Sequence, residues 1–437
     1  MQTLPRKIQP QLETAMAESP VVLLQGARET GKTHLVKGLC EKYGNPYISL
    51  ESGRKFEMAC ADPVGFAADL PPRIALDGFH RVPELFDLIR AMAAKSEEPG
   101  RVLLSGSSEI LQSPGVQELP EGLLQSFQLY PVSKIESLGG TPKFLDRLYN
   151  LDFEGIASRR LGNELLDNLF QGGFPTVLSK DSKKPPKPWM DSYLESLSQQ
   201  DIKGLANIRA KDRIPELLKH TALQTARIFN ASELTRPFKL SRPTIRDYVT
   251  LLEQLFVVER IPAWYNEPLA KFAETASKMP GSEGLAAKLM NRLNRVMKTA
   301  KLYMADTGFA LAATGLKSKQ LKDNPELYGK MVDNFIYTEL RAQASWSPEP
   351  YEFSHYVDKD KYSVDVVIEK DKNHQTCGVE VTPNSTIRET MLRGLKRLKD
   401  ACGKTFHCGV LLYDGPDVKS FGDKLFAVPL AAVWEEG

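Results

Sequence analysis

The fold is decided by the stretch Gly26-Ala27-Arg28-Glu29-Thr30-Gly31-Lys32-Thr33, which matches the phosphate-loop pattern G-x-x-x-x-G-K-[ST] in full. The apolar run before it, residues 21–24, has the composition of a buried strand, and the segment from His34 onward can open a helix. Glycines at both ends of the loop would let backbone N–H groups turn toward a phosphate. Lys32 would reach the β- and γ-phosphates, and the Thr33 hydroxyl would bind Mg²⁺. We therefore expect residues 26–34 to bind ATP with Mg²⁺.

A P-loop ATPase also needs an acidic residue at the end of another apolar strand, where it holds the water shell of the magnesium ion. Residues 73–76 lead into Asp77 and follow the breaker pair Pro71-Pro72. We expect Thr33 and Asp77 to form the metal site, and Asp77 and Lys32 to take part in catalysis. The next residue is Gly78, where many ATPases carry a glutamate that polarises the attacking water. Hydrolysis is therefore expected to be slow, and Gly78→Glu is expected to raise it.

A third apolar strand is predicted at residues 101–104, and it runs into Ser105-Gly106-Ser107-Ser108. A serine hydroxyl there could sense the γ-phosphate. The segment is equally typical of a helix N-cap, so both interpretations stay open.

Motifs along the chain resemble those of prokaryotic AAA-type ATPases that carry a C-terminal domain of uncharacterised function. The similar segments follow in the same order and lie at residues 76–85, 104–108, 130–133, 171–175, 301–308, 409–415 and 428–430. They include the turn Gln-Gly-Gly-Phe-Pro at 171–175 and the strand end Lys-Leu-Tyr-Met-Ala-Asp-Thr-Gly at 301–308. The resemblance covers nearly the whole chain, and it implies an AAA-type ATPase domain followed by a second functional region.

The chain departs from this family at positions that bear on hydrolysis. Gly78 stands where the family usually has glutamate, and His80 stands near a usual glutamine. Gly122-Leu123 replaces a usual glycine-arginine pair. Each change removes a charged or polar group that would assist hydrolysis, whereas the residues expected to bind the nucleotide are retained. The resemblance thus implies nucleotide binding and leaves turnover open.

Length and composition are typical of a multidomain cytoplasmic protein. The 437 residues allow two to three domains, and the formal net charge of +2 is too small to indicate nucleic-acid binding by itself. No uncharged apolar run is long enough for a membrane span, and residues 1–7 lack the apolar core of a signal peptide. The five cysteines have no C-x-x-C spacing, so neither a disulfide framework nor a zinc site is expected. We expect a cytoplasmic location and no membrane partner.

Four regions are expected along the chain, and together they predict the α/β fold class. They are a P-loop AAA-type ATPase core at 1–138, a helical region with a linker near 179–188 at 139–228, a winged helix-turn-helix with a basic amphipathic insertion at 229–300, and a degenerate restriction-endonuclease-like α/β domain at 301–437. The linker is expected because lysine- and proline-rich sequence favours exposed irregular structure.

Helical periodicity between residues 190 and 262 ends in a pattern typical of a winged helix-turn-helix. Ser241 is a candidate N-cap, apolar residues recur at 245, 249 and 252, and residues 256–264 are expected to form a wing strand. In a DNA-binding version, the first residues of this helix would face the major groove. The candidate DNA contacts are Ser241, Arg242, Thr244 and Arg246. Packing of this helix as a lid on the ATPase or as an oligomer contact is an equally open alternative.

Residues 267–300 look like an insertion relative to the family. A loop is expected at 279–284, followed by a basic amphipathic helix whose apolar stripe contains Leu285, Leu289, Leu293 and Val296-Met297. We favour packing of this helix on its own domain over a membrane or nucleic-acid role.

The C-terminal third resembles the restriction-endonuclease-like core, in which carboxylates on adjacent strands hold Mg²⁺ and a nearby lysine steadies the attacking water. Asp365, on an alternating strand at 362–368, and Glu380, on the next strand, match the two carboxylates. Asp333, on a helix at 331–340, matches an upstream acidic position, and Thr382 occupies the lysine position. Because threonine supplies no positive charge, we expect no nuclease activity, although the acids could still hold a metal weakly.

Two classes of function remain in competition. The first is a slow ATPase that couples its nucleotide state to a winged-helix and nuclease-like module on double-stranded DNA. The second is a non-hydrolysing ATP-dependent switch or assembly scaffold that acts on a protein partner or on further copies of itself. Hydrolysis that depends on Lys32 favours the first class, and tight nucleotide binding without turnover favours the second.

Overall fold

The computed structural model describes residues 4–94, 98–108, 122–156, 158–179, 182–197, 213–279, 282–370 and 374–435. Two compact units result, each assembled from segments that are separate in the sequence. The first comprises Met1–Ser137, Gln171–Leu218 and Thr235–Val258, and the second comprises Leu138–Phe170, Lys219–Leu234 and Glu259–Gly437. Within the ranges described, no helix is long and apolar enough to cross a membrane.

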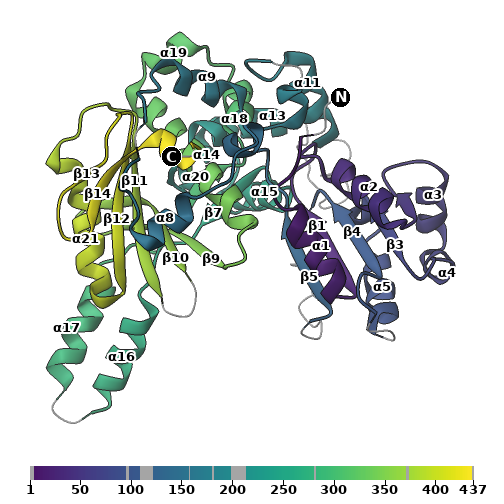
Figure 1. The fold of residues 1–437 in the computed structure, drawn as a ribbon, viewed down its shortest axis with the longest axis horizontal. Helices are drawn as coiled ribbons and strands as arrows, with labels where there is room; N and C mark the ends of the chain where they lie inside the picture. Colours follow the sequence, from purple (N-terminus) through teal and green to yellow (C-terminus); the bar gives the residue numbers. More distant parts are fainter. Residues whose placement is uncertain are drawn as a thin grey trace. The chain divides into compact units, whose positions relative to one another are not determined.

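A five-stranded parallel sheet lies at the centre of the first unit, with the strand order β2-β3-β4-β1-β5. Figure 1 labels all of its strands except β2. All five residues of β1 are buried, because this strand has a neighbour on both sides and is covered on both faces. The strands expected at 21–24, 73–77 and 101–104 are confirmed. The five strands are β1 (Val21–Gln25), β2 (Tyr47–Ser49), β3 (Ile74–Asp77), β4 (Val102–Gly106) and β5 (Leu124–Gln128).

Helices pack on this sheet and complete the hydrophobic core of the first unit. Apolar side chains of β1, β3 and β4 join a buried cluster with Phe66, Phe79 and Phe86. The helices of this unit are α1 (Gln9–Glu18), α2 (Lys32–Tyr43), α3 (Arg54–Ala61), α4 (Pro63–Ala68), η1 (Phe79–Arg81), α5 (Leu85–Ala94), α7 (Lys134–Ser137), α10 (Pro175–Leu178), α11 (Lys187–Ser196) and α15 (Arg242–Gln254).

The proline-rich segment at 179–188 leads directly into a helix. Lys183 and Lys184 are exposed, as expected of a linker, whereas Pro185 is buried. The helix α11 begins at Lys187, two residues earlier than expected, because proline at the first turn of a helix is tolerated. Residues 180–181 of the linker, and the expected helix end at Gln199, lie outside the described residues.

Residues 214–304 contain α13, β6, α14, α15 and β7 and, after a helical insertion, β8, in that order along the chain. Its strands form a three-stranded sheet in the order β6-β8-β7, with β6 antiparallel to β8. The expected wing strand at 256–264 is shorter than predicted, because Pro262 cannot donate a ladder hydrogen bond. The elements not yet bounded are α13 (Ile214–Leu223), β6 (Arg227–Ile228), α14 (Ala231–Phe238), β7 (Val258–Ile261) and β8 (Lys301–Met304).

Between β7 and β8 the chain forms a helical hairpin of α16 (Glu267–Ser277) and α17 (Glu283–Leu293), which pack against each other (Figure 1). Asn266 caps α16 and donates from Nδ2 to the carbonyls of Ala401 and Cys402, which ties the base of the hairpin to a distant part of the same unit. The expected apolar stripe is only partly buried, because Leu293 is buried whereas Leu285 is 48% exposed. Pro280 and Gly281, in the expected loop, lie outside the described residues.

The second unit is built on a six-stranded mixed sheet in the order β13-β14-β12-β11-β10-β9. The pairs β9/β10, β10/β11 and β13/β14 are antiparallel, whereas β11/β12 and β12/β14 are parallel. The helix that carries Asp333 is longer than the expected 331–340. The strands are β9 (Tyr351–Val357), β10 (Ser363–Lys370), β11 (Gln375–Thr382), β12 (Phe406–Tyr413), β13 (Lys419–Ser420) and β14 (Leu425–Pro429).

The helices of the second unit complete its core against this sheet. A buried cluster joins Trp264, Val364 and Val367 to leucines of α21. Burial in β10 is continuous over Val364–Ile368 rather than alternating as expected, because α21 packs on this strand and Lys301 and Tyr303 contact Asp365. The helices are α8 (Phe144–Asn150), α9 (Asn163–Gln171), α18 (Thr307–Thr314), α19 (Ser318–Lys322), α20 (Pro325–Ser345), η4 (Glu389–Leu392), α21 (Arg393–Cys402), η5 (Gly403–Thr405) and η6 (Leu430–Val433).

Candidate functional site

The phosphate-loop residues connect β1 to α2 and adopt a backbone that requires glycine. Gly26 and Gly31 have φ values of 150° and 100°, in the region that L side chains rarely adopt. A Cβ at Gly26 would lie 2.3 Å from the backbone oxygen of Leu129, so no side chain fits there. Glu29 also has a positive φ of 62°, which indicates a loop held in one shape by its surroundings.

Lys32 folds back over this loop. Its Nζ donates to the carbonyl oxygens of Gly26 and Ala27 at 2.8 and 2.7 Å, and the side chain is buried. The ammonium therefore lies within the curve of the loop, where backbone N–H groups and a lysine together suit an anion.

Asp77 accepts hydrogen bonds from three hydroxyl groups that come from different segments. Thr33 Oγ1 and Tyr47 Oη donate to Asp77 Oδ2 at 2.7 and 2.8 Å, and Ser105 Oγ donates to Oδ1 at 2.5 Å. Burial and the neighbouring carboxylate raise the pKa of Tyr47 above its ordinary value, which keeps this hydroxyl protonated and able to donate. Thr33 and Asp77, the two residues expected to form the metal site, are thus brought together by the pairing of β1, β4 and β3.

Ser107, in the segment considered as a γ-phosphate sensor, contacts His80. Its Oγ lies 3.1 Å from His80 Nε2. Burial and the positive charges of Lys32 and Arg28 lower the pKa of His80 to about 3, so the imidazole is neutral at physiological pH. Ser105, near the end of β4, therefore contacts the acidic residue, and Ser107, just after this strand, contacts the histidine.

The first unit has a cavity of about 1020 Å³, which is bordered by Lys32, Thr33, Asp77 and Ser107 among others. The volume is at the upper end of the range for small-molecule sites and is large enough for a nucleotide. Polar lining comes from the loop, Asp77 and Ser107, and apolar lining comes from Leu4, Val132 and Pro175. The lining from the loop and the start of α2 consists of Arg28, Glu29, Thr30, Gly31, Lys32, Thr33 and His34.

Two contacts that hold the loop were not predicted from the sequence. Arg6 donates to the carbonyls of Thr30 and Tyr130, both at 2.7 Å, and forms a buried ion pair with Glu136 at 3.1 Å. Trp189 Nε1 donates to Glu29 Oε2 at 2.5 Å. Arg6 lies 24 residues from Thr30 and Trp189 lies 160 residues from Glu29, so local sequence carries no signal for either contact.

Gly78, the residue after Asp77, has a φ of 75°. A Cβ built on it would lie 2.9 Å from Oε1 of Glu51. A side chain at residue 78 would be strained at this φ and would require the carboxylate of Glu51 to move, and the gain in hydrolysis expected from Gly78→Glu stays a prediction.

The four candidate DNA-contacting residues lie at the start of α15. Ser241 is the N-cap and accepts from the Thr244 backbone N at 3.3 Å, as expected. The Thr244 hydroxyl lies 2.7 Å from Ser241 Oγ, so it takes part in the cap, and its side chain is half-buried. Arg242 and Arg246 are exposed.

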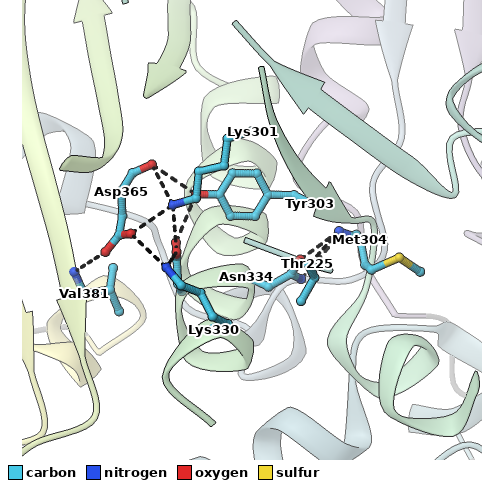
Figure 2. A network of polar contacts seen from close by, with 9 residues as sticks. Thr225, Lys301, Tyr303, Met304, Lys330, Asn334, Asp365 and Val381 are labelled. Carbon is cyan, nitrogen blue, oxygen red and sulfur yellow. Dashed lines mark hydrogen bonds and ion pairs between the residues drawn. The ribbon is translucent and has the colours of Figure 1, made fainter. Parts of the chain in front are cut away.

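In the second unit the buried ammonium of Lys301 contacts two carboxylates, and Figure 2 shows it beside Asp365. Lys301 Nζ donates to Asp333 Oδ2 at 2.8 Å, to Asp365 Oδ1 at 2.9 Å and to the Asp365 carbonyl at 3.2 Å. Lys330 lies 3.6 and 3.7 Å from the same two carboxylates. The Tyr303 hydroxyl donates to Asp333 Oδ1 at 3.0 Å. Two lysines from other elements, Lys301 on β8 and Lys330 on α20, thus place positive charge beside Asp333 and Asp365.

The electrostatics of this cluster follow from burial and pairing. Burial opposes the charge on Lys301, but Asp333 and Asp365 raise its pKa above the ordinary value. Burial raises the pKa of Asp333 to about 6. Burial also acts against ionised Asp365, but the two lysines hold the pKa of this carboxyl below its ordinary value. Asp365 is thus the carboxylate that stays ionised, and it pairs with both lysines.

Glu380 and Thr382 lie on β11 beside this cluster. The pairing of Val366 with Val379 places Glu380 next to Asp365, and burial together with the Asp365 charge raises the pKa of Glu380 well above its ordinary value. The Thr382 hydroxyl accepts from the backbone N of Asn384 at 3.3 Å. Across the residues that the structure describes, no group of three or more His, Cys, Asp or Glu side chains is arranged to hold a metal ion.

Lys301 and Lys330 were not predicted as site residues. Lys301 opens the Lys-Leu-Tyr segment that carried part of the family resemblance, and Lys330 precedes Asp333 by three residues on one helix. The second spacing is a usable signal, because residues three apart are neighbours on a helix surface.

Comparisons with protein families identify three regions. Residues 18–138 match the model of an AAA domain. They form an AAA-type ATPase domain. Residues 162–279 and 328–433 match two models that are each described as a domain of unknown function, DUF8612 and DUF4143.

Two similar relatives are uncharacterized proteins of Mycobacterium tuberculosis and Mycobacterium bovis. Each is 25% identical over 348 residues, which are 78% of this chain and 66% of the relative. The chain thus spans slightly less than two thirds of the length of these relatives.

Several solved structures are similar to this chain at low identity. A Walker-type ATPase of Pyrococcus abyssi shares 15% identity over 72% of this chain and 96% of its own, with a TM-score of 0.34. The RuvB Holliday junction branch migration motor of Thermotoga maritima shares 17% identity over 59% of this chain and 88% of its own, with a TM-score of 0.28. AMPPCP-bound DnaA from Aquifex aeolicus shares 12% identity over 65% of this chain and 92% of its own, with a TM-score of 0.24.

Proposed function

We propose that this protein binds ATP with Mg²⁺ in the cavity of the first unit and hydrolyses it slowly. The observation that carries the proposal is the hydrogen bond from Thr33 Oγ1 to Asp77 Oδ2 at 2.7 Å, beside the phosphate loop that surrounds the Lys32 ammonium. A hydroxyl and a carboxylate in this arrangement suit a magnesium ion and its water shell, and the lysine suits the β- and γ-phosphates.

Nucleotide binding requires Lys32 to change partners. Its ammonium now donates to the carbonyls of Gly26 and Ala27, and phosphate oxygens would replace those acceptors. Tyr47 and Ser105 keep Asp77 oriented by donating to it, so the carboxylate is ready to accept from metal-bound water. Bound Mg²⁺ would offset negative charge that develops on the transferred phosphoryl group.

Association of this ATPase with double-stranded DNA through a winged helix is a further part of the proposal. It is supported by the order α13-β6-α14-α15-β7, followed by β8 after the inserted hairpin of α16 and α17, and by the sheet order β6-β8-β7. Apart from the hairpin, both orders are typical of winged helices. Exposed Arg242 and Arg246 at the start of α15 would contact the major groove or its phosphates.

A restriction-endonuclease-like domain without cleavage activity completes the proposal. The order α20-β9-β10-β11-α21-β12, with antiparallel β9, β10 and β11 and a parallel β12, favours that core. Its acidic residues Asp333 and Asp365 are neutralised internally by Lys301. An ammonium in this position competes with a metal ion, so this domain would serve in DNA association or assembly rather than in hydrolysis of DNA.

The alternative function is an ATP-dependent switch or scaffold without hydrolysis, acting on a protein partner or on copies of itself. Gly78, which offers no carboxylate after Asp77, favours this alternative. Steady-state phosphate release by the full chain, measured with and without double-stranded DNA, separates the two functions, since only the first one predicts release.

Lys32→Ala tests nucleotide binding itself. Titration with a fluorescent ATP analogue and Mg²⁺ should show binding to the wild type and none to this variant, because a principal positive charge for the phosphates is lost. Lys42→Ala is the matched control, since Lys42 lies on the same helix and pairs with Glu13 at the surface. Equal affinity of wild type and Lys32→Ala, with unchanged circular dichroism, would contradict the proposal.

A further inference from the structure

The carboxylate of Glu51, which follows the neighbouring strand β2, lies in the space that the side chain of residue 78 would enter. A Cβ at Gly78 would be 2.9 Å from Oε1 and 3.1 Å from Cδ of Glu51. Gly78 thus removes the usual glutamate from this position and at the same time makes room for another one.

The parallel pairing of β2 with β3 explains how Glu51 reaches this position. Ser49 is paired with Asp77, and the Leu50 backbone N donates to the Asp77 carbonyl at 2.7 Å. Glu51 therefore leaves the carboxyl end of β2 next to the carboxyl end of β3. Functional groups of parallel sheets gather at this edge.

The surroundings of Glu51 keep its carboxylate at the cavity. Arg28 of the phosphate loop and Arg81 of η1 each approach Glu51 Oε2 to 3.8 Å. Glu51 lines the same cavity as Lys32, Thr33 and Asp77, and 38% of its side chain is exposed, so water can reach it.

Two other candidate bases fit less well. His80 contacts Ser107 and has a pKa of about 3, which makes it a weak proton acceptor at neutral pH. Glu84 is exposed and does not line the cavity.

We propose that Glu51 is the carboxylate that polarises the attacking water, in place of a glutamate after Asp77. This inference rests on the proposed ATP hydrolysis. The water oxygen forms a bond to the γ-phosphorus while the bond from that phosphorus to the β–γ bridging oxygen breaks, and the bridging oxygen leaves with ADP. Glu51 accepts a proton from the water and then releases it to solvent.

Glu51→Gln in the full chain tests this assignment, because glutamine keeps the size of the side chain and removes its charge. We expect kcat for phosphate release to fall by about 10²-fold or more, while the affinity for the fluorescent ATP analogue and KM change little. Glu57→Gln is the matched control, since Glu57 is exposed on α3 and does not line the cavity. It should hydrolyse ATP at the wild-type rate.

Three results would overturn the inference, and they separate it from the proposed function. Equal kcat in wild type and Glu51→Gln would exclude Glu51 as the base while leaving the ATPase intact. If the wild type binds nucleotide but releases no phosphate, with or without DNA, there is no hydrolysis for Glu51 to assist. Only the proposed nucleotide binding then remains. Absence of binding by the wild type would refute the proposed function itself.

Discussion

At the scale of single residues, charge placement decides what each site can do. Lys32 lies in the phosphate loop with backbone carbonyls as acceptors, which a phosphate can replace. Lys301 instead lies between two carboxylates, with its three N–H groups satisfied by Asp333 and Asp365. A ligand could thus replace the carbonyl acceptors of Lys32. The ion pairs of Lys301 instead stabilise the second unit.

Lys301→Met should therefore destabilise the protein strongly. Removal of one partner from a buried ion pair leaves an uncompensated charge, which typically costs about 3–5 kcal/mol. Lys330→Met should cost much less, because Lys330 is 31% exposed and lies farther from the same carboxylates. Urea unfolding followed by circular dichroism compares the two variants, and equal midpoints for both would show that Lys301 does not hold the cluster together.

At the scale of elements, α15 presents two exposed arginines at a capped helix start. If this helix meets DNA, the double variant Arg242→Ala, Arg246→Ala should bind a duplex more weakly and with a shallower salt dependence. The slope of log K against log salt should fall by about 1 to 2, because each neutralised phosphate contributes about 0.9. Fluorescence anisotropy across salt concentrations measures this slope.

The control for this experiment comes from α16, where Lys271 and Lys278 are exposed and pair with glutamates on the same helix. Lys271→Ala, Lys278→Ala changes the net charge equally and should leave the slope as in the wild type. A wild-type slope in the arginine variant would indicate that α15 has a packing role.

At the scale of the whole molecule, buried histidines make stability depend on pH. Burial lowers the pKa of His355 to about 4, and it is also a cause of the low pKa of His80. The unfolded chain takes up protons on these residues below about pH 6.5, whereas the folded chain does not, so both contribute a loss of stability as the pH falls toward 4. Asp333, with a pKa of about 6, acts in the opposite direction because its folded form takes up a proton first.

His355→Gln should make the thermal unfolding midpoint fall by less between pH 6.5 and pH 4 than it does in the wild type. Glutamine can still donate to the Thr299 carbonyl, which lies 2.8 Å from His355 Nε2, but it takes up no proton in the unfolded chain. Differential scanning calorimetry over this pH range gives the midpoints. Parallel curves for wild type and variant would show that His355 contributes nothing to the acid sensitivity.

The whole protein should not cleave DNA. Long incubation of plasmid and linear DNA with Mg²⁺ or Mn²⁺ should leave both substrates intact on gels, since Lys301 occupies the space between the acidic side chains. Asp365→Ala and Glu380→Ala are the controls for contaminating nuclease. Cleavage by the wild type that both variants lose would mean that the acids bind a catalytic metal despite the lysine.

The sequence by itself predicted the features that depend on neighbouring residues. The phosphate loop, the strands before it and around residues 74 and 102, and the Ser241 cap all lie within short segments whose local backbone and side chains suffice. The roles of the expected site residues and the domain boundaries at 138, 228 and 300 remain predictions.

Only the tertiary structure decided which distant residues meet. Tyr47 reaches Asp77 and Glu51 reaches Gly78 because β2 pairs with β3, and no spacing in the sequence encodes that pairing. Lys301 reaches Asp365 across 64 residues because the fold brings side chains of β8, α20 and β10 together, which places an ammonium between Asp333 and Asp365. A short motif folds through the backbone and side chains of its own residues, so it can be read from local sequence. The charge balance of a buried site depends on strand order and on the packing of segments far apart in the chain, so it cannot.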